Sequence, residues 1–431
     1  MDIRKIILGF IFSISGLHFL YAQKDSAVWD LQACLDYAKQ NNITINSLRL
    51  TAKADEQNLI GSKAAKYPDL SGSISQGITR YNSGAISSSG YGINSSVTLY
   101  NGGYLNNDIQ SKQLQLLAAN LDVEAAQNDI TLQITEAYLN ILLAKENVVY
   151  AKDVVATSEA QVIQGQQRYE AGSLAKKDLL ELQAVLANDK YNFTTAENTV
   201  RQDILTLKQI LQLPSDIIFD VTSVDTIVST TLVAPLSETQ QIAQTRRPEV
   251  KSSQLSVMAA QTEVEKARAG LRPTVGLNGS LYSGYSQNPQ YKYFQQLNNN
   301  FYQQLGVSVS IPIFDRKITK TNVEKAKIQV QQATLSLKNT KTNLSQSVEQ
   351  AYINVLNAQS QYAAAEEQLK YAEESYRIAN EQLKIGVYNT VEYLQQKNLY
   401  VQALQSYVQA KYTAALYIKI YNFYMGQPVT Q

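Results

Sequence analysis

Two residue types that most enzyme and metal sites require are nearly missing from this sequence. Its 431 residues include one histidine, His18, and one cysteine, Cys34. A single cysteine excludes an intrachain disulfide. His18 lies in the N-terminal stretch that we expect to be removed, so the mature chain has no histidine. This excludes Cys–His nucleophiles, histidine acid–base catalysis and His/Cys zinc sites, and leaves open catalysis by carboxylates alone. Cys34 lies at helical spacing from Leu31 and Leu35, which favours a small buried core residue over a reactive thiol.

The chain that follows residues 1–22 also lacks a net charge of either sign. Residues 1–22 combine the basic start MDIRK with a short apolar run that ends in Ala22. This pattern predicts a cleaved signal peptide, with an uncleaved anchor as the alternative, and no cysteine follows to carry a lipid. The remaining chain keeps 36 basic and 36 acidic residues. A neutral chain gives no electrostatic reason to expect nucleic acid as a partner.

Proline is scarce too, with 8 in the chain, and this allows very long helices. Small and large apolar residues alternate at 3.5-residue spacing over 130–169 and again over 344–383, which indicates coiled-coil packing. Each pattern runs into a single glycine, Gly172 or Gly386, and a second helical stretch follows, to about Leu213 or Tyr424. Because glycine tolerates positive φ, we expect two long helical hairpins with these glycines at their tips.

The two hairpins match each other at an offset of 214 residues. Ala137 and Tyr138 align with Ala351 and Tyr352, and the two tip glycines align as well. The period is too long for a solenoid, whose repeats span about 20–50 residues, so it indicates a duplicated half. We expect a first repeat at 23–212, a linker at 213–236, a second repeat at 237–426 and a tail at 427–431.

Each repeat also contains a stretch with the two-residue period of β-strands, and these predict hairpins at 68–100 and 273–314. One face is apolar, as at Leu70, Ile74 and Leu99, whereas the other is small and polar. A soluble sheet with one buried face fits this pattern, and so does a transmembrane barrel strand. Export without a helix long enough to span a bilayer favours the barrel. Four strands cannot close a barrel, so several copies would have to contribute strands.

Several short motifs carry a family resemblance: LQACLDYAKQNNITINSLRL (31–50), KYP (66–68), LYNGG (99–103), RRPEV (246–250), LRP (271–273), IPIFDR (311–316) and the two glycine tips. In this order, and duplicated, they resemble the TolC-family outer-membrane factors, also called outer membrane efflux proteins. The resemblance implies an α+β membrane protein that forms a homotrimer. Four strands per protomer would build a 12-stranded transmembrane β-barrel, continued by a long periplasmic α-helical barrel of coiled-coil hairpins.

The same resemblance implies a function and a location. Family members are passive exit ducts of tripartite efflux pumps or type I secretion systems in the Gram-negative outer membrane. Their periplasmic tip is opened by an adaptor (membrane fusion) protein and by an inner-membrane RND, ABC or MFS transporter. The expected partners are therefore two further copies, these proteins and outer-membrane lipid. The second hairpin is nine residues longer than the first, and its extra residues in SQNPQYKYFQQLNNN would form an extracellular loop.

The resemblance also assigns gate residues by their distance from the tip glycines. Glu392 and Gln395 take the positions of the family's acidic constriction, so that one of the two charges is missing here. Asp178 takes the position that helps to hold the closed tips, but its basic partner is replaced by Tyr388. The alternative for Glu392 and Asp178 is a solvated helix face. The expected tip and adaptor-contact residues are Gly172, Gly386, Ser173, Val387, Lys176 and Lys177, and the two lysines could replace the missing basic partner.

Two other classes of function remain at this point. One is a structural periplasmic coiled-coil protein of the envelope, or an efflux adaptor without a pore, but neither needs alternating strands. The other is a carboxylate-dependent hydrolase, for which the sequence shows no pocket-forming organisation. We therefore expect no catalytic residue, no metal ligand and no cofactor. The transported cargo cannot be predicted from the sequence.

Overall fold

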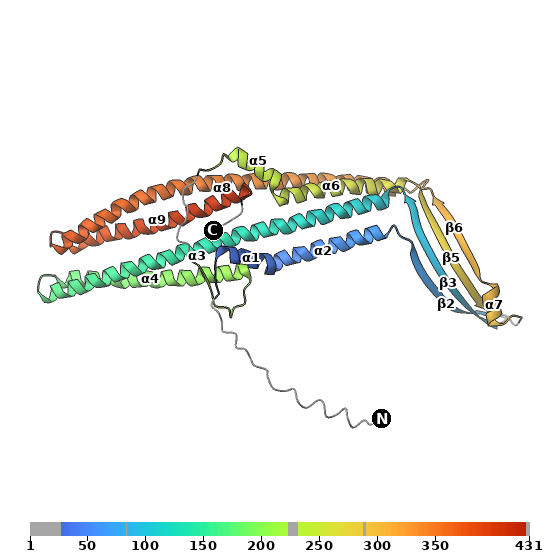
Figure 1. The fold of residues 1–431 in the computed structure, drawn as a ribbon, viewed down its shortest axis with the longest axis horizontal. Helices are drawn as coiled ribbons and strands as arrows, with labels where there is room; N and C mark the ends of the chain where they lie inside the picture. Colours follow the sequence, from blue (N-terminus) through green and yellow to red (C-terminus); the bar gives the residue numbers. More distant parts are fainter. Residues whose placement is uncertain (1–26, 83, 223–231, 288–289, 428–431) are drawn as a thin grey trace, which may run out of the picture.

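The computed structural model describes residues 27–427, except 83, 223–231 and 288–289. The expected signal peptide at 1–22 lies outside the described residues, as do much of the linker and nearly all of the tail. Figure 1 shows an elongated molecule in which long helices fill one end and a β-sheet forms the other. None of the helices in the described ranges is long and apolar enough to cross a membrane.

Two helices of equal length define the long axis. Helices α3 (Tyr104–Glu170) and α8 (Ile318–Lys384) each contain 67 residues, or about 100 Å at 1.5 Å per residue. Each turns back at its glycine into a partner, α4 (Lys176–Leu211) or α9 (Thr390–Tyr424). Both long helices begin and end 214 positions apart, and so do the starts of their partners. This supports the duplication, which stays a prediction.

Shorter helices cover the sheet-side halves of the long ones. Along the first half run α1 (Leu31–Asn41) and α2 (Ile43–Ala64). The second half has α5 (Leu236–Arg246) and α6 (Pro248–Arg268), followed by a short 3₁₀ turn, η2, at Ala269–Leu271. In Figure 1, α2 lies beside α3 and α6 beside α8, and both run toward the sheet.

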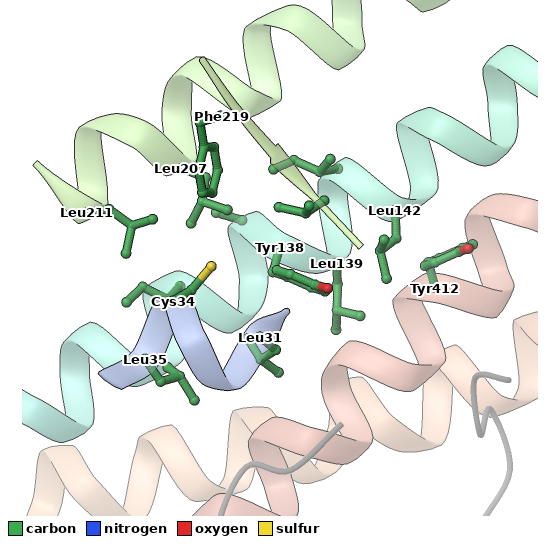
Figure 2. Packing of buried hydrophobic residues seen from close by; sticks show 14 of the residues in the cluster. Leu31, Cys34, Leu35, Tyr138, Leu139, Leu142, Leu207, Leu211, Phe219 and Tyr412 are labelled. Carbon is green, nitrogen blue, oxygen red and sulfur yellow. The ribbon is translucent and has the colours of Figure 1, made fainter. Parts of the chain in front are cut away.

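The main apolar core sits near the middle of the molecule, where α1, α3, α4 and α9 meet (Figure 2). Strands β1 (Ala27–Trp29) and β4 (Phe219–Val221) pair in parallel at this level. Cys34 is fully buried there, as the sequence predicts. Burial raises the pKa of its thiol to about 12, so this cysteine is unreactive at neutral pH.

The sheet contains four antiparallel strands in the order β2-β3-β5-β6. Their bounds are β2 Asp69–Tyr81, β3 Gly84–Asn101, β5 Thr274–Ser286 and β6 Tyr302–Ser310. Strands β2 and β6 are therefore the edges. The register shifts between Thr98 and Tyr100, so that Tyr100 lies opposite Val275. Leu99 is therefore an extra residue in β3 without a partner on β5. An extra residue reverses the faces of the residues that follow it. The alternation that predicts Leu99 on the apolar face thus ends at this point.

The connection between β5 and β6 holds a short helix, α7 (Tyr293–Asn299), where the sequence predicts a loop. Gln296 is its buried residue. Its side-chain oxygen accepts a hydrogen bond from the Ser286 N–H at 3.1 Å, and its amide donates to the Tyr291 carbonyl at 3.1 Å. These bonds fasten the helix to the end of β5.

Candidate functional site

The two hairpin tips share one turn geometry. Gly172 has φ +73° and Gly386 has φ +78°, in the left-handed region that favours glycine. The residue after each glycine, Ser173 or Val387, donates its N–H to the carbonyl five positions earlier, at 2.8 and 2.9 Å. This bond satisfies a carbonyl of the ending helix and turns the chain back. Each glycine therefore lies in the turn between two helices of the structure.

At the second tip, the predicted gate residue Glu392 caps a helix. Its N–H donates to the side chain of Asn389 at 2.9 Å, and its carboxylate accepts from the Asn389 N–H at 3.4 Å. This reciprocal pair is a capping box at the start of α9. Glu392 and Gln395 are exposed, whereas Tyr388 is half-buried. The carboxylate keeps its place at the tip through this cap.

At the first tip, Asp178 lies half-buried in the first turn of α4. An acidic side chain there interacts favourably with the helix N-terminus. Lys176 and Lys177 are exposed, and Lys177 Nζ lies 3.6 Å from Glu181 Oε1 of its own helix. Within the described part of this single copy, no hydrogen bond or ion pair joins these residues to the second tip. The replacement of the missing basic partner by a lysine stays a prediction.

A buried ion pair that sequence reasoning missed joins the two hairpins behind the tips. Lys397 Nζ on α9 lies 2.7 Å from Asp189 Oδ2 on α4, and their side chains are 3% and 10% exposed. Ser158 on α3 accepts from Lys397 and donates to Asp189. The three residues thus connect α3, α4 and α9. The sequence held a signal for this lysine. Lys397 comes four positions after Tyr393, so the two side chains lie on the same face of α9, and Tyr393 is buried.

A second buried group lies beside this pair. The hydroxyls of Tyr376 and Tyr393 are 3.0 Å apart, and Gln161 of α3 donates to Tyr393. Burial raises the pKa of Tyr393, which is fully enclosed. Further from the tips, Lys411 on α9 lies 3.1 Å from Glu146 on α3. Polar bonds therefore tie α9 to the first hairpin at three levels.

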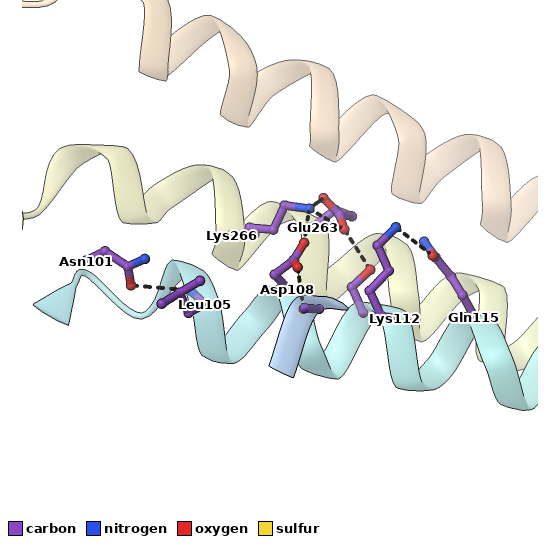
Figure 3. Close-up of polar contacts among 9 residues, drawn as sticks. Asn101, Leu105, Asp108, Lys112, Gln115, Glu263 and Lys266 are labelled. Carbon is purple, nitrogen blue, oxygen red and sulfur yellow. Dashed lines mark hydrogen bonds and ion pairs between the residues drawn. The ribbon is translucent and has the colours of Figure 1, made fainter. Parts of the chain in front are cut away.

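Nearer the sheet, a further polar cluster joins α2, α3 and α6 (Figure 3). Lys266 lies 3.0 Å from Asp108 and 2.8 Å from Glu263. Ser62 donates to Asp108 and Ser111 donates to Glu263, at 2.5 and 2.6 Å. Burial alone would raise the pKa of Asp108, but the bonds from Ser62 and Lys266 hold it below its usual value. Every charged group of this cluster has a partner, which is typical of a structural junction.

One face of the sheet leaves large apolar side chains uncovered. Leu70 on β2, Ile74 on β2 and Leu305 on β6 are 77%, 81% and 78% exposed. Leu70, Ser95, Gly279 and Leu305 pair across the four strands, so they share this face. The opposite face carries serine, glycine and asparagine. In water a surface of this kind marks an interaction site with protein or membrane.

Comparison with known proteins matches most of the chain to one family. The family model described as "Outer membrane efflux protein" matches residues 34–212 and 240–416. The outer membrane efflux protein BepC of Brucella suis is 22% identical over 391 residues, which cover 89% of this chain and 82% of BepC. The outer membrane protein TolC of Vibrio cholerae is 23% identical, over 77% of this chain and 76% of TolC.

Solved structures show the same fold. A crystal structure of CusC superposes with a TM-score of 0.81 at 18% identity, and covers 95% of this chain and 96% of that chain. The family model matches two segments that together contain both β-hairpins and both helical hairpins, except the end of α9 after residue 416. The chain belongs to the outer membrane efflux protein family, a family of channels and not of enzymes.

Proposed function

We propose that three copies of this chain form an outer-membrane duct, with their sheets closed into a 12-stranded barrel. The observation that carries the proposal is the four-stranded sheet with two open edges and an uncovered apolar face. Exposed edge strands pair readily with other strands, and a barrel removes all edges. The apolar face would meet lipid and the polar face would line the lumen.

The helical hairpins supply the rest of the duct. The two tips of each copy lie at the same end of the molecule, far from the sheet (Figure 1). Six tips in a trimer would surround the periplasmic opening. Helices α3 and α8 contain 67 residues each, so the helical part could reach about 100 Å from the membrane.

The proposed system is a tripartite pump or a type I secretion machine. Relatives include TolC and, from Bordetella pertussis, CyaE, which is 25% identical over 84% of this chain. Another relative is an alkaline protease secretion protein, AprF. By this likeness an adaptor protein and an inner-membrane RND, ABC or MFS transporter would open the tips. The duct itself would be a passive conduit.

The decisive measurement combines the mass of the purified protein with its conductance in a planar bilayer. We expect the mass of three chains and stepwise ion conductance. Leu305→Lys and Gln304→Lys are a matched pair, because these neighbours lie on opposite faces of β6. A lysine on the lipid face costs about 2–4 kcal/mol near the bilayer midplane, so Leu305→Lys should reduce assembled trimer, whereas Gln304→Lys should assemble. A monomer without conductance, or equal tolerance of both lysines, would contradict the proposal.

A further inference from the structure

Helix α7 packs on the apolar face of the sheet. The hydroxyl of Tyr293 lies 2.7 Å from that of Tyr91, and the Ser283 hydroxyl donates to the Leu297 carbonyl at 2.5 Å. Tyr91 pairs with Ile74 and with Ser283 across the sheet. Directly paired residues point to the same face, so α7 covers the face on which Ile74 is exposed. The helix is therefore on the outside of the proposed barrel, away from the lumen.

The position of α7 along the strands matches the far edge of a membrane. Figure 1 shows it at the end of the sheet away from the helices. Val275, opposite Tyr100, marks the helix end of β5, and the contacts of α7 begin at Ser283 and reach Ser286. These sites lie roughly 27 and 37 Å from Val275 along the strand. With strands tilted by about 40°, the rise along the membrane normal is roughly 20 to 28 Å, and the apolar band of such barrels is about 25 Å tall.

The outer surface of α7 has the composition of a membrane interface. Phe294 is 80% exposed, and Tyr291 beside the helix is 52% exposed. Aromatic residues concentrate at the level of lipid headgroups. Residues 70–101 and 274–310 contain no acidic residue, and their charged side chains are Arg80 and Lys292. Two cations at the far end of the sheet suit the phosphate groups of lipid headgroups.

We propose that α7 is an interfacial anchor, which rests against the outer rim of the barrel and inserts Phe294 among the lipid headgroups of the outer leaflet. The partner is a lipid surface, and the mouth of the lumen stays uncovered by this helix. The inference rests on the proposed function, because that function makes the apolar face the lipid-facing one. It adds a contact outside the strands to the membrane boundary.

The test uses single cysteines labelled with an environment-sensitive fluorophore. Cys34 is fully buried, so the folded protein takes label only at an introduced residue. Phe294→Cys reports on α7, and Leu305→Cys reports on the middle of the apolar face. Ser75→Cys is the matched control, because Ser75 pairs with Gly90, which pairs with Gly284, at the level of α7 but on the opposite face.

Each labelled trimer is reconstituted in phosphatidylcholine vesicles that carry nitroxide quenchers on the headgroup or deep in the acyl chain. We expect the Phe294 label to be quenched more by the headgroup nitroxide, the Leu305 label more by the deep one, and the Ser75 label only by iodide in the water. If the Phe294 label responds like the Ser75 label while Leu305 stays lipid-quenched, the anchor is refuted but the duct is not. Loss of lipid quenching at Leu305 would overturn the duct and the anchor together.

Discussion

At the residue scale, Glu392 caps helix α9, and we propose that its charge also attracts cations to the opening. Its carboxylate caps α9 through Asn389, which holds it in place at the tip. Three such carboxylates, one from each copy, would ring the opening and attract cations. A substitution to alanine would remove the cap and the charge at once. Glutamine separates the two effects, because it also serves at this position of a capping box.

We therefore expect Glu392→Gln to lower the cation selectivity of the purified protein without changing its melting temperature. The selectivity is measured from the reversal potential in a salt gradient across a planar bilayer. Glu381→Gln is the control, because Glu381 is also an exposed acid near the tip and pairs with Lys384. Unchanged selectivity in Glu392→Gln would place the residue outside the constriction and favour a solvated helix face.

The buried Lys397–Asp189 pair gives a second prediction at this scale. Removing one partner leaves a buried charge without compensation, which costs about 3–5 kcal/mol. Lys397→Met or Asp189→Leu alone should therefore lower the denaturant midpoint of the helical circular dichroism signal strongly. The double variant should recover most of the loss, because replacing both charges with apolar groups is often nearly neutral. Additive losses in the double variant would show that the two side chains do not act as a pair.

At the scale of elements, substitution by alanine should lower the stability of the protein at a tip glycine and raise it at a glycine inside a helix. A Cβ at Gly386 meets nothing within 4 Å, so its substitution acts through the positive φ alone. Gly386→Ala should destabilise the turn by roughly 1–2 kcal/mol. Gly61, inside α2, also has open space around it. Gly61→Ala should stabilise by up to about 1 kcal/mol.

Denaturant unfolding of both glycine variants checks this contrast. Equal effects at the two positions would show that the left-handed conformation of Gly386 is not what the turn requires.

The long helices and the strands were predictable because their patterns are local. The 3.5-residue seam and the two-residue alternation depend on the chain itself, and the tip glycines interrupt a regular pattern. The shift at Thr98 and Tyr100 was not predictable, since it arises from pairing with another strand. Helix α7 was missed because its seven residues are too few for a periodic signal. The Lys397–Asp189 contact joins positions 208 apart, and only the packing of α9 against the first helical hairpin brings them together.

At the scale of the whole molecule, the matched lengths of α3 and α8 set the tips at one level. One additional turn in either helix would displace its tip by about 5.4 Å. Polar bonds between α9 and the first hairpin at three levels hold the two hairpins to each other over this distance. The family and its fold could be predicted from motifs in order. The contacts of the gate could not be predicted in the same way, because they would form between copies of the chain.

The open edges of the sheet have a consequence for how such a chain is made. A lone copy in water would present two strand edges without a partner and a row of exposed aliphatic side chains, which is the surface of an aggregation-prone intermediate. The helices bury their own seams, so they can fold before their neighbours arrive. In the proposed duct, the sheet would gain its full stability only when partner copies and bilayer are both present. If several copies form one duct, their assembly would compete with aggregation, and a chaperone that shields the open sheet would favour assembly.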